Sequence, residues 1–370
     1  MQSNYRKLGG FIHQVDTRNN DARLGEENLY GISVTKEFII SHANLVGVTF
    51  ESYKVVAPCQ FAYIPDTSRR GDKIAISLNT FGEDIIVSSI CSVFKIIDEN
   101  QLLPEYLMLW FMRPEFDRYA RFMSNGSARE VFDWDCMCNV ELPVTSIDEQ
   151  RRIVHDYQVI TDRIELLQKI NEKLYSYLNT QFERIASNVT SFIPLSSLCD
   201  YVTKKEYYKN LPEQNYLSTE NLLQNKRGIA GFSEIKDDVR VTRFQEHDTL
   251  IANIRPYFKK IWFATVSGGC DSDVLCFRAH ASEDACLLNA VLYQDKFFDY
   301  VMSGAKGTKM PRGDKNHIMQ YPVPSLSQDK KNEFLLLSER IQSLQAIKKR
   351  EIDVLQSMKV LFVNNITKGA

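Results

Sequence analysis

Basic residues gather with glycines and aromatic residues at two places in this sequence, and they are the strongest candidates for a binding surface. In the first half the candidates are Arg69, Arg70 and Lys73, on a glycine-containing loop, and Arg129, which follows Asn125-Gly126-Ser127. In the second half they are Asn253, Arg255, Tyr257, Lys259, Lys260, Lys306, Thr308, Lys309 and Arg312. Cationic side chains beside aromatic rings and glycines suit a surface that lies along an anionic backbone.

A solvated surface charge is the alternative interpretation for any one of these residues. The clusters are stronger candidates than their members, because they occupy matching places in the two halves of the chain. We interpret two other basic runs, Lys204-Lys205 and Lys348-Lys349-Arg350, as solvated faces.

The sequence lacks the motifs of several enzyme classes. It contains neither the Asp/Asn-Pro-Pro-aromatic motif of amino-methyltransferases nor a Gly-x-Gly-x-x-Gly fingerprint after a strand. The run from Gly304 to Lys309 is superficially similar to a P-loop but lacks its spacing. Pro65-Asp66 is not followed by the acidic-x-Lys pattern of a nuclease, and His155 has no catalytic-triad context. We therefore expect a chain without catalytic activity of its own.

The eight cysteines do not predict a metal site. Cys136 and Cys138 are the only close pair, and one intervening residue is the wrong spacing for a zinc knuckle. No histidine pair lies near them at ligand spacing. We expect that the chain binds no metal and that its cysteines are reduced thiols.

Composition and charge limit the class of protein. Hydrophobic residues make up 44% and charged residues 25% of the 370 positions, which is ordinary for a globular protein with two domains. The apolar run from Ile85 to Ile97 is too short to span a bilayer, and the polar start of the chain does not resemble a signal peptide. We expect a soluble, cytoplasmic protein without membrane contact.

The net charge of −2 bears on nucleic acids as ligands. A protein that binds DNA unaided usually carries a basic surplus that displaces counterions from the phosphates. Either DNA is not the ligand, or basic residues are confined to certain surfaces and partner proteins supply part of the positive charge. The net charge alone favours the first possibility.

The chain repeats itself at an interval of about half its length. Two stretches, 144–193 and 325–368, lack both glycine and proline, and each follows a proline-marked turn. Each also opens with a Ser-x-x-Glu/Gln capping box, at Ser146 to Glu149 and at Ser325 to Gln328. Upstream, Phe116-Asp117-Arg118-Tyr119 and a glycine turn at Gly126 have counterparts in Phe298-Asp299-Tyr300 and Gly307. A constant offset in matching context predicts a duplicated unit, each copy ending in a long helix.

The two long helices have the apolar spacing of coiled-coil partners. In the first, Ile153, Ile160, Leu167 and Leu174 fall seven residues apart. In the second, Ile341, Leu355 and Phe362 define one seam line, and Leu344 and Met358 define the other. A helix lying on its own domain is the alternative, but about 38 residues at 1.5 Å each is longer than such a domain needs. We therefore expect the helices to pack antiparallel.

Mixed α/β segments precede each long helix. Strands are predicted at 53–56, 73–77, 85–87, 249–252, 261–264 and 274–277. Helices are predicted at 103–122, with Pro114 kinking or dividing it, and at 286–302. The predicted fold class is α+β: two similar mixed α/β domains separated by two long helices that form an antiparallel coiled coil. The two domains are predicted at 1–145 and 191–325, and the two long helices at 146–190 and 326–370.

This order of elements resembles the specificity subunits of type I restriction–modification systems. In the first half the resemblance is carried by Tyr5-Arg6-Lys7-Leu8-Gly9, by the run from Gly31 to Lys36, by Tyr53-Lys54-Val55-Val56, by Gln60-Phe61-Ala62-Tyr63 and by the run from Thr67 to Lys73. The family's turn into its long helix has two prolines and a glutamine. The first copy has Thr145 in place of the second proline, and the second copy has Asp329 in place of the glutamine.

The resemblance implies a non-catalytic subunit with two target recognition domains, each reading one half of a bipartite site in double-stranded DNA. The basic candidates would then contact base edges or phosphates. Two modification subunits would dock on the chain and supply S-adenosylmethionine, and restriction subunits would supply ATP- and Mg-dependent translocation and cleavage. No cofactor is expected on this chain. A protein-interaction scaffold, and the specificity half of a fused or degenerate type II restriction enzyme, are the alternatives.

Overall fold

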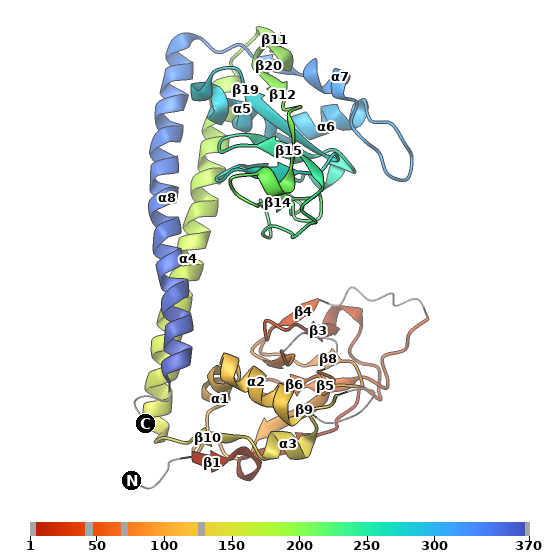
Figure 1. The fold of residues 1–370 in the computed structure, drawn as a ribbon, viewed down its shortest axis with the longest axis vertical. Coiled ribbons are helices and arrows are strands. Elements are labelled where there is room, and N and C mark those ends of the chain that lie inside the picture. Colours follow the sequence, from red (N-terminus) through yellow and green to blue (C-terminus); the bar gives the residue numbers. More distant parts are fainter. Residues whose placement is uncertain (1–4, 41–46, 68–72, 125–129, 367–370) are drawn as a thin grey trace. The chain divides into compact units, whose positions relative to one another are not determined.

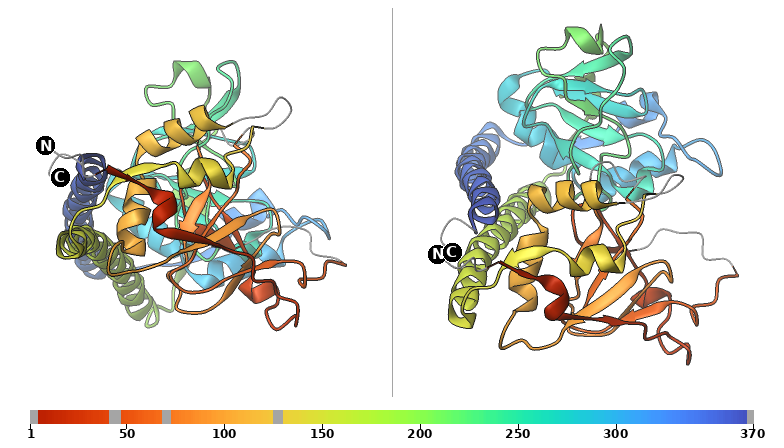
Figure 2. Two further views of the ribbon diagram at one scale, coloured as in Figure 1. Left: turned by 90° about the horizontal axis from the view of Figure 1, so that it is seen from below. Right: turned by 60° about the horizontal axis from the view of Figure 1, so that its bottom comes forward.

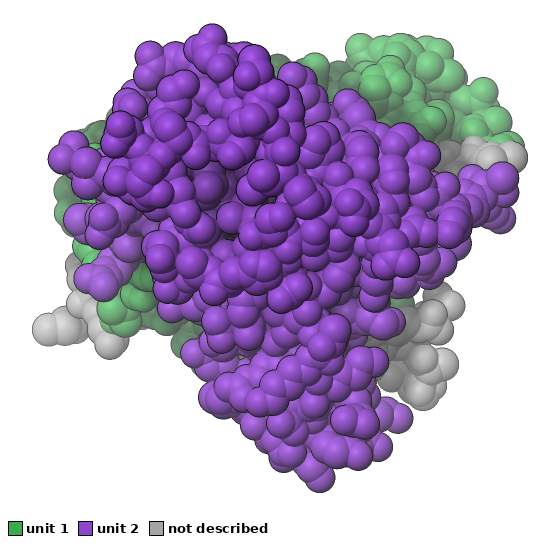
Figure 3. Space-filling model, turned by 90° about the horizontal axis from the view of Figure 1, so that it is seen from above, with its two compact units in different colours: residues 1–166, 351–370 green, residues 167–350 purple. Residues whose placement is uncertain are grey.

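The computed structural model describes residues 5–40, 47–67, 73–124 and 130–366. The chain divides into two compact units, one made of residues 1–166 and 351–370 and the other of residues 167–350 (Figure 3). Both boundaries fall inside long helices, so each unit contains a part of each helix. We call them unit 1 and unit 2.

Unit 1 is built around a four-stranded antiparallel sheet with the order β2-β9-β6-β7. Three strand pairs, β1–β10, β3–β4 and β5–β8, accompany it. The strands are β1 (Tyr5–Lys7), β2 (Ile12–Val15), β3 (Tyr30–Ile32), β4 (Phe38–Ile40), β5 (Lys54–Val56), β6 (Phe61–Tyr63), β7 (Ile76–Leu78), β8 (Ile85–Val87), β9 (Ser92–Ile96) and β10 (Glu141–Pro143). The helices are α1 (Pro104–Phe111), α2 (Pro114–Met123), α3 (Trp134–Cys138) and α4 (Ile147–Ala186), of which residues 147–166 belong to this unit.

In the central sheet of unit 1, strands β6 and β7 are buried at every residue, whereas β2 and β9 each have at least one exposed residue. On one face Phe61 and Phe94 stack, with ring centroids 4.8 Å apart, and pack against α1 and α2 (Figure 1). On the other face Ala62 and Val93 pack against the β5–β8 pair. Pro114 lies at the start of α2 and divides the predicted helix, because proline has no N–H to continue α1.

Unit 2 contains two four-stranded sheets, with the orders β12-β19-β16-β17 and β13-β15-β18-β14, and the pair β11–β20. The strands are β11 (Phe192–Pro194), β12 (Cys199–Tyr201), β13 (Lys205–Tyr207), β14 (Tyr216–Leu217), β15 (Arg240–Phe244), β16 (Thr249–Ala252), β17 (Ile261–Phe263), β18 (Gly268–Cys270), β19 (Val274–Ala279) and β20 (Pro322–Pro324). The helices are α5 (Ala285–Leu292), α6 (Asp295–Ser303), α7 (Lys315–Met319) and α8 (Gln328–Asn365), of which residues 328–350 belong to this unit.

The two units share one plan, which confirms the duplication predicted from the sequence. The sheet β2-β9-β6-β7 of unit 1 corresponds strand for strand to β12-β19-β16-β17 of unit 2, and both are antiparallel throughout. Two helices follow each sheet, and then a short helix capped by an aspartate. Asp133 accepts a hydrogen bond from the amide of Cys136, and Asp314 accepts from the amides of Asn316 and His317.

Helices α4 and α8 pack antiparallel, as predicted (Figures 1 and 2). Within unit 1, the rings of Tyr157 and Phe362 lie 6.1 Å apart and Arg163 forms an ion pair of 2.6 Å with Glu351. Within unit 2, Gln345 donates to the carbonyl of Asn171 at 3.2 Å, and the rings of Phe182 and Phe334 lie 5.5 Å apart. As the residue number rises along α4, the residue number of the contacting partner on α8 falls, so the two helices run antiparallel.

The predicted seam is confirmed on α4 and on one line of α8. Ile153, Leu167 and Ile341 are buried, and the remaining members of these lines, Ile160, Leu174, Leu355 and Phe362, are half-buried.

The second predicted line of α8 is wrong. Leu344 and Met358 are 46% and 47% exposed. The seam instead contains the next residue in each case, Gln345 and Lys359. Gln345 bonds to α4, and the Lys359 ammonium lies 4.8 Å from the centre of the Tyr157 ring. Polar side chains therefore occupy positions where the pattern predicts apolar ones.

The capping boxes of the two long helices differ. Ser146 caps α4, since its hydroxyl accepts a hydrogen bond of 3.4 Å from the amide of Glu149. Ser325 does not cap α8, which begins at Gln328. The Ser325 amide donates to the carbonyl of Ser191 at 2.9 Å and extends the β11–β20 pairing. The second predicted capping box is therefore wrong.

Two further predicted elements differ in their bounds. The helix predicted at 286–302 is divided into α5 and α6, because Gln294 is extended and both Phe297 and Phe298 turn into the core. The strand predicted at 73–77 lies at Ile76–Leu78, and the amide of Ile74 donates to the carboxylate of Asp117 at 3.2 Å instead of pairing in the sheet. Among the described helices, none is both long and apolar enough to cross a membrane.

Candidate nucleic-acid interface

Three of the four candidates in unit 1, Arg69, Arg70 and Arg129, lie outside the described residues. Lys73 is described and exposed. The chain on either side of these segments is joined by hydrogen bonds. The amide of Thr67 donates to the carbonyl of Glu130 at 3.0 Å, and its hydroxyl donates to Ser124 at 2.9 Å. The structure thus brings together the ends of the two segments that carry the candidates.

The candidates of unit 2 lie on two loops that the structure joins into one surface. The loop between β16 and β17 carries Asn253 to Lys260, and the loop between α6 and α7 carries Lys306 to Arg312. The amide of Arg255 donates to the carbonyl of Pro311 at 2.7 Å, and Ile254 forms a β-bridge with Arg312. The corresponding bridge in unit 1 joins Asp66 and Val131. The same connection therefore exists in both units.

The β16–β17 loop has a strained backbone. Arg255 and Lys259 both adopt the left-handed conformation, with φ of 51° and 50°. They flank a 3₁₀ turn, Pro256–Phe258, from which Tyr257 projects with 46% of its surface exposed. Non-glycine residues in this region cost of order 1 kcal/mol each and persist where surrounding contacts hold them, typically at functional sites.

Three of the six basic candidates on this surface are ion-paired. Lys306 forms an ion pair of 2.6 Å with Asp314, and Arg312 forms two hydrogen bonds of 2.9 Å with Asp273. Lys259 binds Asp295 at 2.9 Å. Asp314 and Asp273 each pair with one of these cations, whereas Asp295 is shared between Lys259 and Lys226. Through these ion pairs the three residues brace the loops.

Lys260 is also engaged, since its ammonium donates to the carbonyl of Thr219 at 2.7 Å. Burial lowers the pKa of Lys260 from its ordinary value. Like the three ion-paired residues, Lys260 holds the loop in place.

Four of the candidates remain available to a ligand. In the described part of the chain, no ion pair or side-chain hydrogen bond engages Arg255, Tyr257, Thr308 or Lys309. The Nε of Arg255 is buried without a hydrogen-bond partner, and so is the Oδ1 of Asn253, a side chain that is 7% exposed. Unsatisfied polar atoms beside exposed donors are typical of a site that binds a polar ligand.

Sequence reasoning missed the carboxylates that organise this surface. The pKa of Asp314 falls from 3.8 to about 2, chiefly because of the Lys306 ammonium and then because the His317 amide donates to it. Hydrogen bonding to Arg312 lowers the pKa of Asp273. Of these carboxylates, only Asp314 could have been recognised from the local sequence, because aspartate is a common residue at the N-cap of a helix. Among the described residues, no group of three or more His, Cys, Asp or Glu side chains could hold a metal ion.

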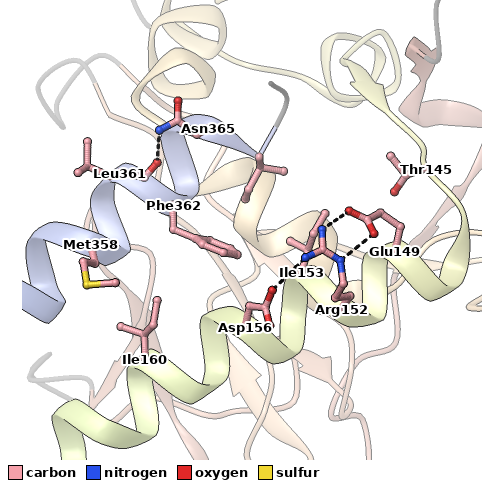
Figure 4. A pocket seen from close by; sticks show the side chains of 11 residues that line it. Thr145, Glu149, Arg152, Ile153, Asp156, Ile160, Met358, Leu361, Phe362 and Asn365 are labelled. Carbon is pink, nitrogen blue, oxygen red and sulfur yellow. Dashed lines mark hydrogen bonds and ion pairs between the residues drawn. The ribbon is translucent and has the colours of Figure 1, made fainter. Parts of the chain in front are cut away.

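A second feature, within unit 1, is an apolar groove between α4 and α8 (Figure 4). Ile153, Ile160, Met358, Leu361 and Phe362 line it, and its volume is about 430 Å³. One rim carries an arginine, Arg152, bound to Glu149 and Asp156 at 2.6 and 3.3 Å. A groove of this kind fits apolar side chains of another protein.

No protein-family model matches the chain, and no curated protein matches it. Among solved structures, the type I restriction–modification S subunit from M. genitalium matches with 12% identity and a TM-score of 0.47, over 98% of this chain and 95% of that one. A chain from a study of the assembly and conformational transition of the type I system matches with 12% identity and a TM-score of 0.48, over 98% and 96%. The HsdS subunit from Thermoanaerobacter tengcongensis matches with 13% identity and a TM-score of 0.38, over 99% and 96%.

Proposed function

We propose that this chain is the DNA-recognition subunit of a type I restriction–modification system, and that each unit reads one half of a bipartite site. The observation that carries the proposal is the repeated plan. Equivalent loops, joined by equivalent bridges, follow equivalent strands in both units, yet they carry different residues. Two such units suit two readers of different sequences.

The free residues of unit 2 have the chemistry that base reading requires. The guanidinium of Arg255 and the ammonium of Lys309 can donate to the O6 and N7 of guanine. Asn253, another predicted contact, is buried. Lys259, Lys306 and Arg312 position the loops through their carboxylate partners. In unit 1, Lys73 and the three arginines Arg69, Arg70 and Arg129 remain the proposed contacts.

The long helices are the proposed spacer and docking element. In the proposed division, residues 146–190 and 326–370 form the coiled coil that fixes the gap between half-sites, and residues 1–145 and 191–325 form the recognition domains. The groove lined by Met358 and Leu361 supports docking of a modification subunit. The full proposal has two such subunits, with restriction and translocase subunits joining them. Methylation and ATP-driven chemistry then belong to these partners, in the cytoplasm where the DNA lies.

Co-purification and methylation test this function. The chain is expressed with the modification subunit encoded beside it, and methylated adenines are mapped on genomic DNA. We expect methylation only when this chain is present, at one bipartite motif. A protein-interaction scaffold, which the groove also suits, would copurify with the partner but leave the methylation pattern unchanged when removed. A type II enzyme half would cleave DNA without a translocase.

A further inference from the structure

A second basic surface lies on the small sheet of unit 2, on the ribbon formed by β13, β15 and the turn that follows β13, residues 204–210 and 240–244. We call it the basic ribbon. It carries five cationic side chains and one acidic one; the cations are Lys204, Lys205, Lys209, Arg240 and Arg243. β13 is the edge strand of its sheet, so the ribbon is open on one side.

Strand register gathers the basic side chains around an exposed aromatic ring. Lys205 and Tyr207 alternate with Glu206 and therefore share one face, and across the ribbon Tyr207 pairs with Arg240. The Arg240 guanidinium and the Lys209 ammonium lie 5.6 and 5.9 Å from the centre of the Tyr207 ring. The ring is 44% exposed. Cations grouped around an aromatic residue are a signature of nucleic-acid surfaces.

Within the described residues no direct ion pair engages Lys204, Lys205, Lys209 or Arg240, in contrast to the cations on the recognition loops. Glu206 lies among them, and the Lys209 amide donates to the carbonyl of Asp237. The acidic member of the ribbon, Glu206, is held by the side-chain amide of Asn210 at 3.1 Å. On the recognition loops, by comparison, Lys259, Lys306 and Arg312 form ion pairs with aspartates.

At the corresponding place in unit 1 the basic side chains are ion-paired. There β5 pairs with β8 on one edge, and on its other edge Lys54 forms a single β-bridge with Arg18. Both side chains bind Asp16, at 3.3 and 3.0 Å, and hydrogen bonding to Lys54 lowers the pKa of that carboxylate. The unpaired cations are thus specific to unit 2. Protection of an edge strand needs only a single charge, so it does not explain five.

We propose that the basic ribbon binds the phosphate backbone of double-stranded DNA beside the half-site that unit 2 reads. The proposal rests on the proposed function and adds a sequence-independent contact to it. Lys205, Lys209 and Arg240 contact phosphates, and Tyr207 orients them. The ribbon supplies electrostatic attraction that the ion-paired loops lack, which reconciles a net charge of −2 with DNA binding.

The test measures the salt dependence of binding by the full chain copurified with its modification subunits. The ribbon variant combines Lys205→Ala with Arg240→Ala. The control variant combines Arg18→Ala with Lys54→Ala, which removes the same amount of charge from the ion-paired site of unit 1. Binding is measured between 50 and 200 mM salt, on duplexes that carry the motif identified by methylation mapping and on duplexes in which one half-site of that motif is scrambled. Each lost phosphate contact lowers the slope of log K against log salt by about 0.9.

The expected result is a slope smaller by about 1.8 for the ribbon variant on every duplex, and an unchanged slope for the control. A single variant in the turn, Lys209→Ala, lowers the slope by about 0.9 and serves if the strand variant does not fold. An unchanged slope with wild-type DNA binding intact overturns the ribbon proposal alone. A loss confined to one half-site would make the ribbon a base reader and also overturn it. Absence of DNA binding by the wild-type complex overturns the proposed function as well.

Discussion

At the scale of single residues, the proposed recognition surface of unit 2 divides into ion-paired residues that brace the loops and residues without such partners. Lys306 and Arg312 are held by Asp314 and Asp273, whereas Arg255 and Lys309 have no such partner in the described structure. An ion-paired side chain must leave its carboxylate before it can bind a base, and the lost pairing offsets what the new contact contributes. The free residues should therefore carry the discrimination between bases.

We expect Arg255→Ala to reduce discrimination at the half-site read by unit 2 by about 1–3 kcal/mol and to leave the other half unaffected. Binding to duplexes with single substitutions in each half measures this. Lys306→Ala is the matched control, since it removes a cation from the same surface and should weaken all duplexes alike. Equal behaviour of the two variants would contradict the division into braces and readers.

A second residue-scale prediction concerns Asp314. Its pKa is lowered from 3.8 to about 2, so its ionised form stabilises the α7 cap above pH 4, and that stabilisation is lost as the pH falls through about 2. The amides of Asn316 and His317 donate to this carboxylate. Their NMR shifts should titrate with a midpoint near pH 2. With Lys306→Ala the midpoint should rise toward 3.8, and a wild-type midpoint near 3.8 would contradict the pairing.

At the scale of elements, the long helices are predictable from the sequence because their apolar residues recur about every seven positions. Their antiparallel packing is expected because one chain carries both helices, each after a globular unit. The first helix keeps Ile153, Ile160 and Leu167 in its seam. The second misleads, because Leu344 and Met358 are apolar but exposed, whereas Gln345 and Lys359 turn inward. Apolar pattern alone cannot distinguish a seam from an exposed surface such as the groove, which Met358 lines.

Stability measurements test this register. Phe334 is fully buried against Phe182, so Phe334→Ala should lower the free energy of unfolding by about 3–5 kcal/mol. Leu344→Ala, on the same helix and half exposed, should change it by less than about 0.5 kcal/mol. Urea unfolding of the full chain followed by circular dichroism gives both values. A large loss for Leu344→Ala would restore the register predicted from the sequence.

The proposed spacer role predicts the effect of lengthening both helices together. One heptad is inserted beside Asn171 in α4 and one beside Gln345 in α8, at the point where these residues contact each other. Seven residues add about 10 Å, so the preferred gap between half-sites should grow by about three base pairs. The bases read should stay the same. An unchanged gap in the methylated motif would show that the helices do not set it.

At the scale of the whole molecule, clustering of basic residues at matching places located the loops, but it could not sort them. The braces depend on carboxylates distant in the sequence, such as Asp273 for Arg312 and Asp295 for Lys259. The ribbon depends on strand pairing that brings Lys205 and Arg240 together. Such contacts arise from the tertiary fold, and local sequence patterns do not report them.

In the proposed function, one chain carries two independent readers of DNA. The most direct measurement is selection of bound sequences from random duplexes by the full chain with its modification subunits, repeated with Arg255→Ala. We expect two short specific motifs separated by a gap of fixed length and variable sequence. In the variant, only the motif read by unit 2 should relax. One continuous motif, or relaxation of both motifs together, would contradict the account.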